Sequence, residues 1–116
     1  DDFLRGLYGD IGTTYYLFAV TKPRVTTPSQ KGGPIGLETA DGSTFNNFVY
    51  DEYATGKWHN GSNGFSRTPN LVSSVVEASP PNPVILEMEV LPSAQKLYRN
   101  GTVVASSSFG STMNFW

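Results

Sequence analysis

The fold is decided by residues 95–106, which read QKLYRNGTVVAS. Two runs of strand-forming residues flank Asn-Gly at positions 100 and 101, and this dipeptide favours a type I′ turn because both central residues of that turn need a positive φ. The stretch therefore predicts a tight antiparallel hairpin. Its expected cross-strand pairs are Tyr98 with Val103 and Leu97 with Val104.

The segment before this hairpin, residues 84–91, alternates regularly between two kinds of side chain. Glu87 and Glu89 share one face of the predicted strand, because successive side chains in a strand point to opposite sides. The other face carries only apolar residues, which are Val84, Leu86, Met88 and Val90. This pattern predicts that one face enters a core while the acidic face is wet or functional.

The rest of the chain also reads as short extended segments. Residues 13–20 are β-branched and aromatic, and both of their alternating sets are apolar, which predicts a central strand buried on both faces. Residues 34–40 and 44–50 are expected to form a second hairpin around Asp41-Gly42. Shorter strands are expected at about residues 57–60 and 64–68. Because no helical period is visible, roughly seven to ten strands remain, and the predicted fold class is all-β, an antiparallel sandwich or barrel.

Composition limits the classes of protein that need to be considered. The chain has 116 residues, 38% of them hydrophobic, which suits one domain with one core. Its formal charge is −2 and no basic stripe is visible, so nucleic acid is not an expected partner. The chain has no cysteine, which excludes disulfides and thiolate metal sites. It also lacks an 18-residue apolar run, so no membrane-spanning helix is expected.

A family resemblance rests on three segments. Residues 95–106 resemble the Asn-Gly hairpin of concanavalin A-like lectin/glucanase domains, in particular their laminin-G-like branch. Residues 1–4, DDFL, resemble the Asp-Asp-Tyr-hydrophobic segment near the start of such domains, and residues 15–23 resemble the strand that follows and often ends in Lys-Pro. The resemblance implies a jelly roll of two curved antiparallel sheets.

The chain is shorter than the family it resembles. The family's opening and closing strands have no counterpart here, so we expect an incomplete sandwich that is one part of a longer polypeptide. Residues 113–116 end on large apolar side chains, which agrees with this expectation. An incomplete sandwich would expose strand edges, and such edges favour pairing with protein neighbours, including a second copy in a homo-oligomer.

The function expected from these features is non-catalytic recognition on the outside of a cell or virion, with a glycan as the ligand. Aromatic rings pack on the C–H faces of sugars, and polar side chains bind the hydroxyl groups. Trp58, His59 and Asn60 offer that mixture in a glycine-rich segment, and Tyr50 and Tyr53 offer it just upstream. The alternative for Trp58 and Tyr50 is that they fill the core between the sheets.

Two rival functions use other features of the chain. The first is a structural protein of a virion, phage appendage or surface filament, whose incomplete edges pair with neighbours. The second is a glycoside hydrolase in which Glu87 and Glu89 act as acid and nucleophile. Related glucanases carry a Glu-x-Asp-x-Glu strand motif, and here one acidic position is lost in either frame, so the balance is against an enzyme.

Metal binding receives little support from the sequence. Laminin-G-like relatives often bind calcium through Asp side chains and backbone carbonyls, and Asp10, Asp41 or Asp51 could serve. No dense acidic loop is present, so we leave calcium open, assign no ligands and expect no other cofactor. His59 is the only histidine, which argues against a zinc site or a catalytic triad, and we expect it to lie exposed in a loop.

Overall fold

The described part of the chain is all-β, as the sequence predicts. The structure is a computed structural model, and it describes residues 12–22, 33–38, 45–52, 54–62, 71–78 and 82–108. No residue in these ranges is helical. Their strands are β1 (Tyr15–Thr21), β2 (Gly36–Glu38), β3 (Phe45–Tyr50), β4 (Lys57–Ser62), β5 (Leu71–Val76), β6 (Val84–Leu91), β7 (Ala94–Arg99) and β8 (Thr102–Ser107).

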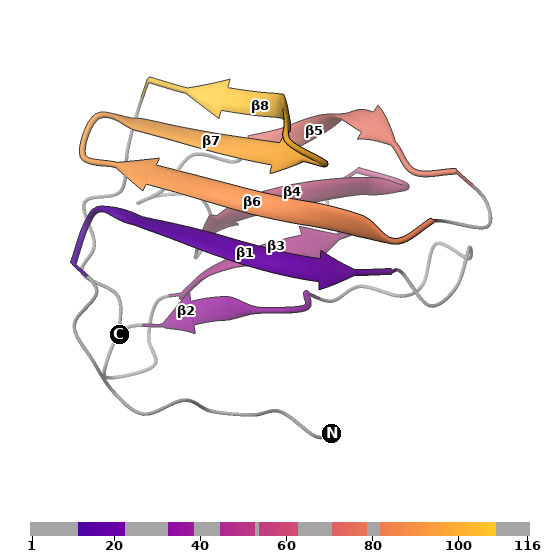
Figure 1. The fold of residues 1–116 in the computed structure, drawn as a ribbon, viewed down its shortest axis with the longest axis horizontal. Helices are drawn as coiled ribbons and strands as arrows, with labels where there is room; N and C mark the ends of the chain where they lie inside the picture. Colours follow the sequence, from indigo (N-terminus) through magenta and orange to yellow (C-terminus); the bar gives the residue numbers. More distant parts are fainter. Residues whose placement is uncertain are drawn as a thin grey trace.

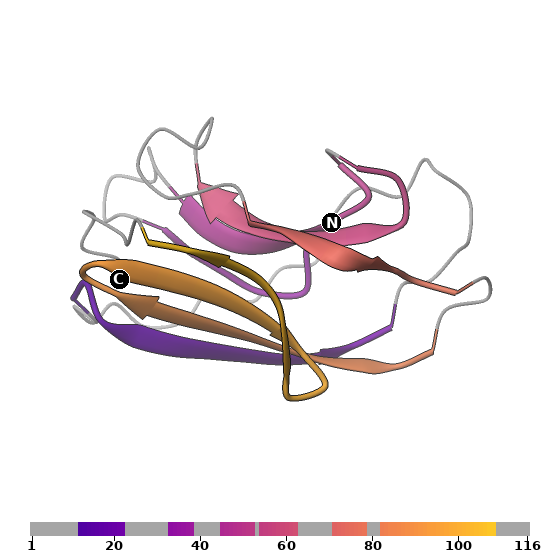
Figure 2. The ribbon, with the colours of Figure 1, turned by 90° about the horizontal axis from the view of Figure 1, so that it is seen from above.

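These strands form two four-stranded antiparallel sheets that pack face to face (Figure 1). The front sheet has the order β1-β6-β7-β8, and the back sheet has the order β2-β3-β4-β5. Figure 2 shows the two layers from above. Every strand pair is antiparallel. The described residues therefore form an antiparallel β-sandwich, which confirms the predicted fold class.

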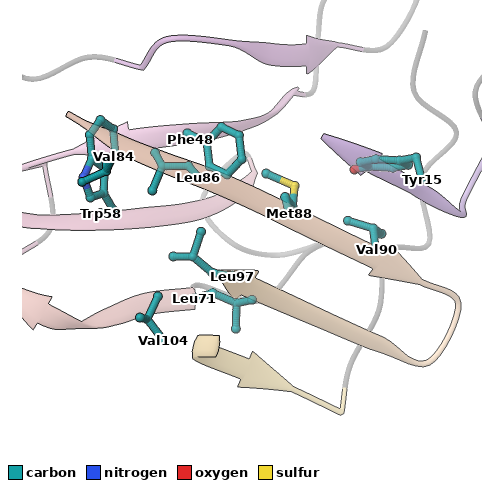
Figure 3. Close-up of a cluster of buried hydrophobic side chains, with 10 residues drawn as sticks. All are labelled: Tyr15, Phe48, Trp58, Leu71, Val84, Leu86, Met88, Val90, Leu97 and Val104. Atoms are coloured by element: carbon teal, nitrogen blue, oxygen red, sulfur yellow. The ribbon is translucent and has the colours of Figure 1, made fainter. Parts of the chain in front are cut away.

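The core begins at β6, which lies between β1 and β7 in the front sheet. Its inward side chains, Val84, Leu86, Met88 and Val90, are each at most 1% exposed. They lie in one line between the sheets (Figure 3). Burial of a side chain of this size contributes about 1.5–3 kcal/mol. The alternation predicted for residues 84–91 is confirmed, because its apolar face is the centre of the core.

The back sheet contributes the opposite wall of this core. Phe48 of β3, Trp58 of β4 and Leu71 of β5 are all nearly inaccessible and pack against the front sheet (Figure 3). Leu97 and Val104 extend the same cluster along β7 and β8. A single apolar layer therefore holds the two sheets together.

Two polar contacts also connect the sheets. Asn46 of β3 donates a hydrogen bond of 2.7 Å from Nδ2 to the hydroxyl of Tyr15 on β1, and burial raises the pKa of that tyrosine to about 12. At the end of β7, Arg99 donates two hydrogen bonds of 2.7 Å to the carboxylate of Glu77, which follows β5. The Glu77 side chain is 1% exposed, so this bidentate pair satisfies a buried charge.

The prediction of a central, doubly buried strand at residues 13–20 is wrong. Strand β1 is one of the two edge strands of the front sheet among the described residues. Its outward side chains are strongly exposed, at 57% for Tyr16, 59% for Phe18 and 78% for Val20. Apolar residues on both sides of a strand predict burial on both sides only if other parts of the chain cover each side. The outward side of β1 instead presents the rings of Tyr16 and Phe18 to solvent.

The Asn-Gly hairpin is confirmed, with one correction to its register. Asn100 and Gly101 have φ values of 50° and 76°, as a type I′ turn requires, and Tyr98 pairs with Val103. The expected pair of Leu97 with Val104 is wrong, because the register shifts and Leu97 lies opposite Ala105. Val104 is the extra residue of a bulge on β8, and its side chain is buried in the core.

The remaining strand predictions fall partly within the described residues. Strands β2 and β3 pair antiparallel, which confirms the strand pairing predicted from residues 34–50, while the Asp41-Gly42 turn lies outside the described residues. The strand expected near residues 57–60 is confirmed as β4. The segment expected at residues 64–68 also lies outside the described residues.

Alanine at Gly101 tests the turn that directs the last two strands. A Cβ at this position would meet no atom within 4 Å, so the only penalty is the positive φ. We expect Gly101→Ala to lower the free energy of unfolding by about 1–2 kcal/mol. Urea denaturation would measure the loss. Gly101→Asn is the matched variant and should lose less, because asparagine tolerates this backbone conformation better; equal losses in the two variants would contradict the assignment of the turn.

Candidate functional site

The residues of β4 that the sequence proposes for sugar binding are buried. Trp58, His59 and Asn60 occupy β4 and are 2%, 0% and 0% exposed. The expectation that His59 lies exposed in a loop is therefore wrong. The alternative for Trp58 is confirmed, since its ring belongs to the core cluster.

Tyr50, one of the two tyrosines proposed alongside them, contacts the Trp58 ring. Tyr50 lies opposite Trp58 in the pairing of β3 with β4, and their ring centroids are 4.9 Å apart at a tilt of 50°. Tyr50 is partly buried against the core, which agrees with the core-filling alternative. Tyr53 lies outside the described residues. None of these positions in β3 and β4 gives a ligand an exposed aromatic ring.

The solvent-facing side of the front sheet carries a different group of residues, which we call the outer face. It consists of the outward side chains of the four strands, namely Tyr16, Phe18, Val20, Ile85, Glu87, Glu89, Leu91, Ala94, Lys96, Tyr98, Val103 and Ser106. The register arranges them in rows across the strands. One row runs Tyr16, Glu89, Lys96, and the next runs Phe18, Glu87, Tyr98.

Glu89 is the centre of a hydrogen-bonded network on this face. Its Oε1 accepts a hydrogen bond of 2.7 Å from the Tyr16 hydroxyl, and its Oε2 accepts one of 2.9 Å from the Tyr98 hydroxyl. The Lys96 ammonium lies 2.8 Å from Oε2. The side chain of Glu89 is only 12% exposed, because its neighbours cover it. Both carboxylate oxygens therefore have partners within the chain.

This network shifts the ionisation of its members. The Lys96 ammonium, followed by the hydroxyls of Tyr16 and Tyr98, lowers the pKa of Glu89 to about 2. The hydrogen bond to Glu89 raises the pKa of Lys96 and that of Tyr16, while burial is the first cause that raises the pKa of Tyr98. Near neutral pH the network therefore contains one carboxylate and one ammonium, whose charges cancel.

Glu87, two residues earlier on the same strand face, has a different environment. It lies between Phe18 of β1 and Tyr98 of β7 in the register, and its side chain is half-buried. It forms no hydrogen bond or ion pair with any residue that the structure describes. The outer face thus contains one satisfied carboxylate and one that is available to a ligand.

The outer face combines exposed rings with hydrogen-bonding groups on a rigid sheet. Phe18 and Tyr16 offer apolar surfaces, and the carboxylate of Glu87 can accept hydrogen bonds from hydroxyl or amino groups. The Cα atoms of Phe18 and Tyr98 are roughly 10 Å apart, which is twice the spacing between neighbouring strands. Such an arrangement suits a ligand with alternating C–H and polar surfaces.

Sequence reasoning identified the two glutamates of this face but missed its aromatic residues. The alternation of residues 84–91 placed Glu87 and Glu89 together, and the predicted hairpin already put Tyr98 on a neighbouring strand. Extending the same register to Lys96 would have found the network. Tyr16 and Phe18 were hidden by the prediction that residues 13–20 are buried on both faces.

The proposed calcium residues are not brought together within the described part of the chain. Asp51 accepts a hydrogen bond from the backbone N–H of Gly56, and its own N–H binds the carbonyl of Lys57, so it orders the turn between β3 and β4. Asp10 and Asp41 lie outside the described residues. Among the residues that the structure describes, no group of three or more His, Cys, Asp or Glu side chains could hold a metal ion.

Comparison with known proteins gave no match to a family model, to a curated protein or to a solved structure. Within the described ranges, no helix has the length and apolar character needed to span a bilayer.

Acid titration tests the network around Glu89. The pKa of Glu89 is about 2 in the folded chain against an ordinary value of 4.5, so the unfolded chain binds the proton first as the pH falls. The stability that this carboxylate contributes is complete above about pH 5 and is lost between about pH 4.5 and pH 2. We therefore expect the urea midpoint to fall more steeply over this range in the wild type than in Glu89→Gln.

A variant that removes only part of the network distinguishes the acid sensitivity due to Glu89 from that due to the other carboxylates of the chain. Tyr16→Phe removes one of the three donors to Glu89, so its loss of stability on acidification should be intermediate. The same acid slope in the wild type, Tyr16→Phe and Glu89→Gln would show that the network does not hold Glu89 ionised.

Proposed function

We propose that the chain is a non-catalytic carbohydrate-recognition module of a cell or virion surface, and that its binding site is the outer face of the front sheet. The observation that carries this proposal is the exposure of Tyr16 and Phe18, at 57% and 59%, beside the carboxylate of Glu87. Sugars present C–H faces that pack on rings and hydroxyl groups that bind to carboxylates. The outer face offers both kinds of partner side by side.

The Glu89 network supports this proposal because it holds part of the face in one arrangement. Tyr16 and Tyr98 approach Glu89 from strands on either side of β6, and each ring is held by its hydroxyl. A side chain that is already ordered loses less conformational freedom when a ligand binds. The rings of Tyr16 and Tyr98 are therefore already ordered before a sugar binds.

The sandwich architecture is compatible with the resemblance to concanavalin A-like domains, which is part of this proposal. Such domains consist of two packed antiparallel sheets, as this chain does, and the Asn-Gly hairpin lies between the last two described strands. Assignment to the laminin-G-like branch, and a place on the outside of a cell or virion, remain parts of this proposal.

The same geometry supports glycoside hydrolysis less well than it supports carbohydrate binding. A general acid of a glycosidase needs a raised pKa, whereas the pKa of Glu89 is lowered to about 2. As a nucleophile Glu89 would be weakened, because the Lys96 ammonium and two hydroxyl donors already stabilise its negative charge. Glu89 is therefore better suited to ordering the outer face than to bond cleavage.

Phe18→Ala is the decisive variant for the binding proposal. The Phe18 ring is exposed, so its removal should leave the fold intact, and the loss of one stacked ring should weaken glycan binding by about three- to tenfold. A glycan array followed by calorimetric titration of the best ligand would measure this. Val76→Ala is the control, since Val76 is equally exposed but lies on the back sheet. Equal affinity in the wild type and Phe18→Ala would contradict the proposed site.

A second candidate function, assembly with copies of itself, is favoured by the composition of β1. Among the described strands, β1 lies at one edge of the front sheet, and it contains no charged residue, proline or glycine over Tyr15–Thr21. Natural edge strands usually carry such residues because they block pairing with another chain. Antiparallel pairing of β1 with β1 of a second copy, centred on Phe18, would place Tyr16 opposite Val20 and Phe18 opposite itself. Cross-strand pairs of aromatic and β-branched residues stabilise such a contact.

The absence of cysteine allows a direct test of this register. Directly opposed residues bring their Cβ atoms within reach of a disulfide. We therefore expect Phe18→Cys to form disulfide-linked dimers under mild oxidation. Ile85→Cys is the matched control, because Ile85 is exposed on β6, whose neighbours β1 and β7 occupy both of its edges. Monomeric wild type in light scattering, together with equal cross-linking of the two variants, would rule out assembly through β1.

A further inference from the structure

The Glu87 carboxylate can accept hydrogen bonds from any sugar, but its negative charge is more than the binding of a neutral sugar requires. It forms no ion pair or hydrogen bond within the described chain, whereas Glu89 on the same strand face has three donors. In the register, Phe18 lies on one side of Glu87 and Tyr98 on the other. A carboxylate between two aromatic residues is suited to a cation, because both the charge and the negative faces of the rings attract it.

Charge on the outer face leads to the same conclusion. The ammonium of Lys96 lies 2.8 Å from Glu89, so these two charges cancel. Glu87 is then the one uncompensated charge among the outward residues of β1, β6, β7 and β8. A ligand complementary to this face carries one positive charge close to an apolar ring surface.

We propose that the outer face recognises a sugar with a free, protonated amino group, such as a glucosamine unit, with the ammonium on Glu87 and the ring against Phe18 and Tyr98. This inference rests on the proposed carbohydrate-binding function and specifies its ligand. A pyranose ring is rigid and loses little freedom on binding. A lysine or arginine side chain of a peptide would lose several rotatable bonds on an exposed sheet face, so it fits this site less well.

The experiment compares two oligosaccharides of equal length, one of glucosamine and one of N-acetylglucosamine, by calorimetric titration at pH 6. Amines of this kind are protonated at that pH, and acetylation removes the charge while the ring is retained. We expect the wild type to bind the glucosamine oligomer about three- to tenfold more tightly, a preference that weakens as salt is added.

Glu87→Gln should abolish this preference, because it replaces the carboxylate by a neutral group of nearly the same shape. Glu52→Gln is the charge-matched control, since Glu52 is exposed beyond β3 of the back sheet, and it should retain the preference. Glu87→Lys should invert the preference, because an ammonium at this position repels the charged sugar. This second variant does not rely on the glutamine side chain of Glu87→Gln. Thermal unfolding would verify that each variant is folded.

The outcomes separate this inference from the proposed function. Equal binding of both oligomers by the wild type, or an unchanged preference in Glu87→Gln, would overturn the inference. If Phe18→Ala then weakens both oligomers alike, carbohydrate binding at the outer face survives without the cationic specificity. Binding of a lysine oligomer that depends on Glu87, with no binding of either sugar, would overturn both proposals.

Discussion

The alternation of side chains along β6 is the constraint on which the rest of the structure depends. This strand pairs with β1 on one side and with β7 on the other, so neither of its edges is free. Leu86 and Met88 point into the core and are inaccessible, while Glu87 and Glu89 point outward. A slip of one residue would bury both carboxylates and expose the apolar row, which would cost far more than any single contact contributes. Burial of one face therefore determines the position of the other.

Identical residue types on this strand face acquire different properties through their neighbours. Glu89 lies between Tyr16 and Lys96. These two residues and Tyr98 donate hydrogen bonds to its carboxylate and lower its pKa to about 2. Glu87 lies between Phe18 and Tyr98 and has no donor among the described residues. The first glutamate stabilises the face and orders its rings. The second remains available to a ligand, and for that reason we assign it the selective role.

Local patterns predicted the parts of the fold that depend on neighbouring residues in the chain. The positive φ values of Asn100 and Gly101 follow from their own chemistry, and the period of two in residues 84–91 needs no partner to be read. The pairing of Leu97 could not be read in this way, because a bulge at Val104 changes the register. Bulges form where packing favours an inward side chain, and Val104 is buried in a core that the local sequence does not describe.

The sequence by itself determined that the chain forms strands, where the last hairpin turns, and which face of residues 84–91 is apolar. These properties follow from backbone preferences and from alternation over a few residues. Only the tertiary structure decided that Trp58 belongs to the core while Tyr16 and Phe18 face solvent. An aromatic residue is equally compatible with either environment, because its exposure depends on which strand lies beside it and which sheet lies above it. The packing of the two sheets buried Trp58, while the order β1-β6-β7-β8 placed Tyr16 and Phe18 on an edge strand and brought Tyr16 beside Glu89, more than seventy positions away in the chain.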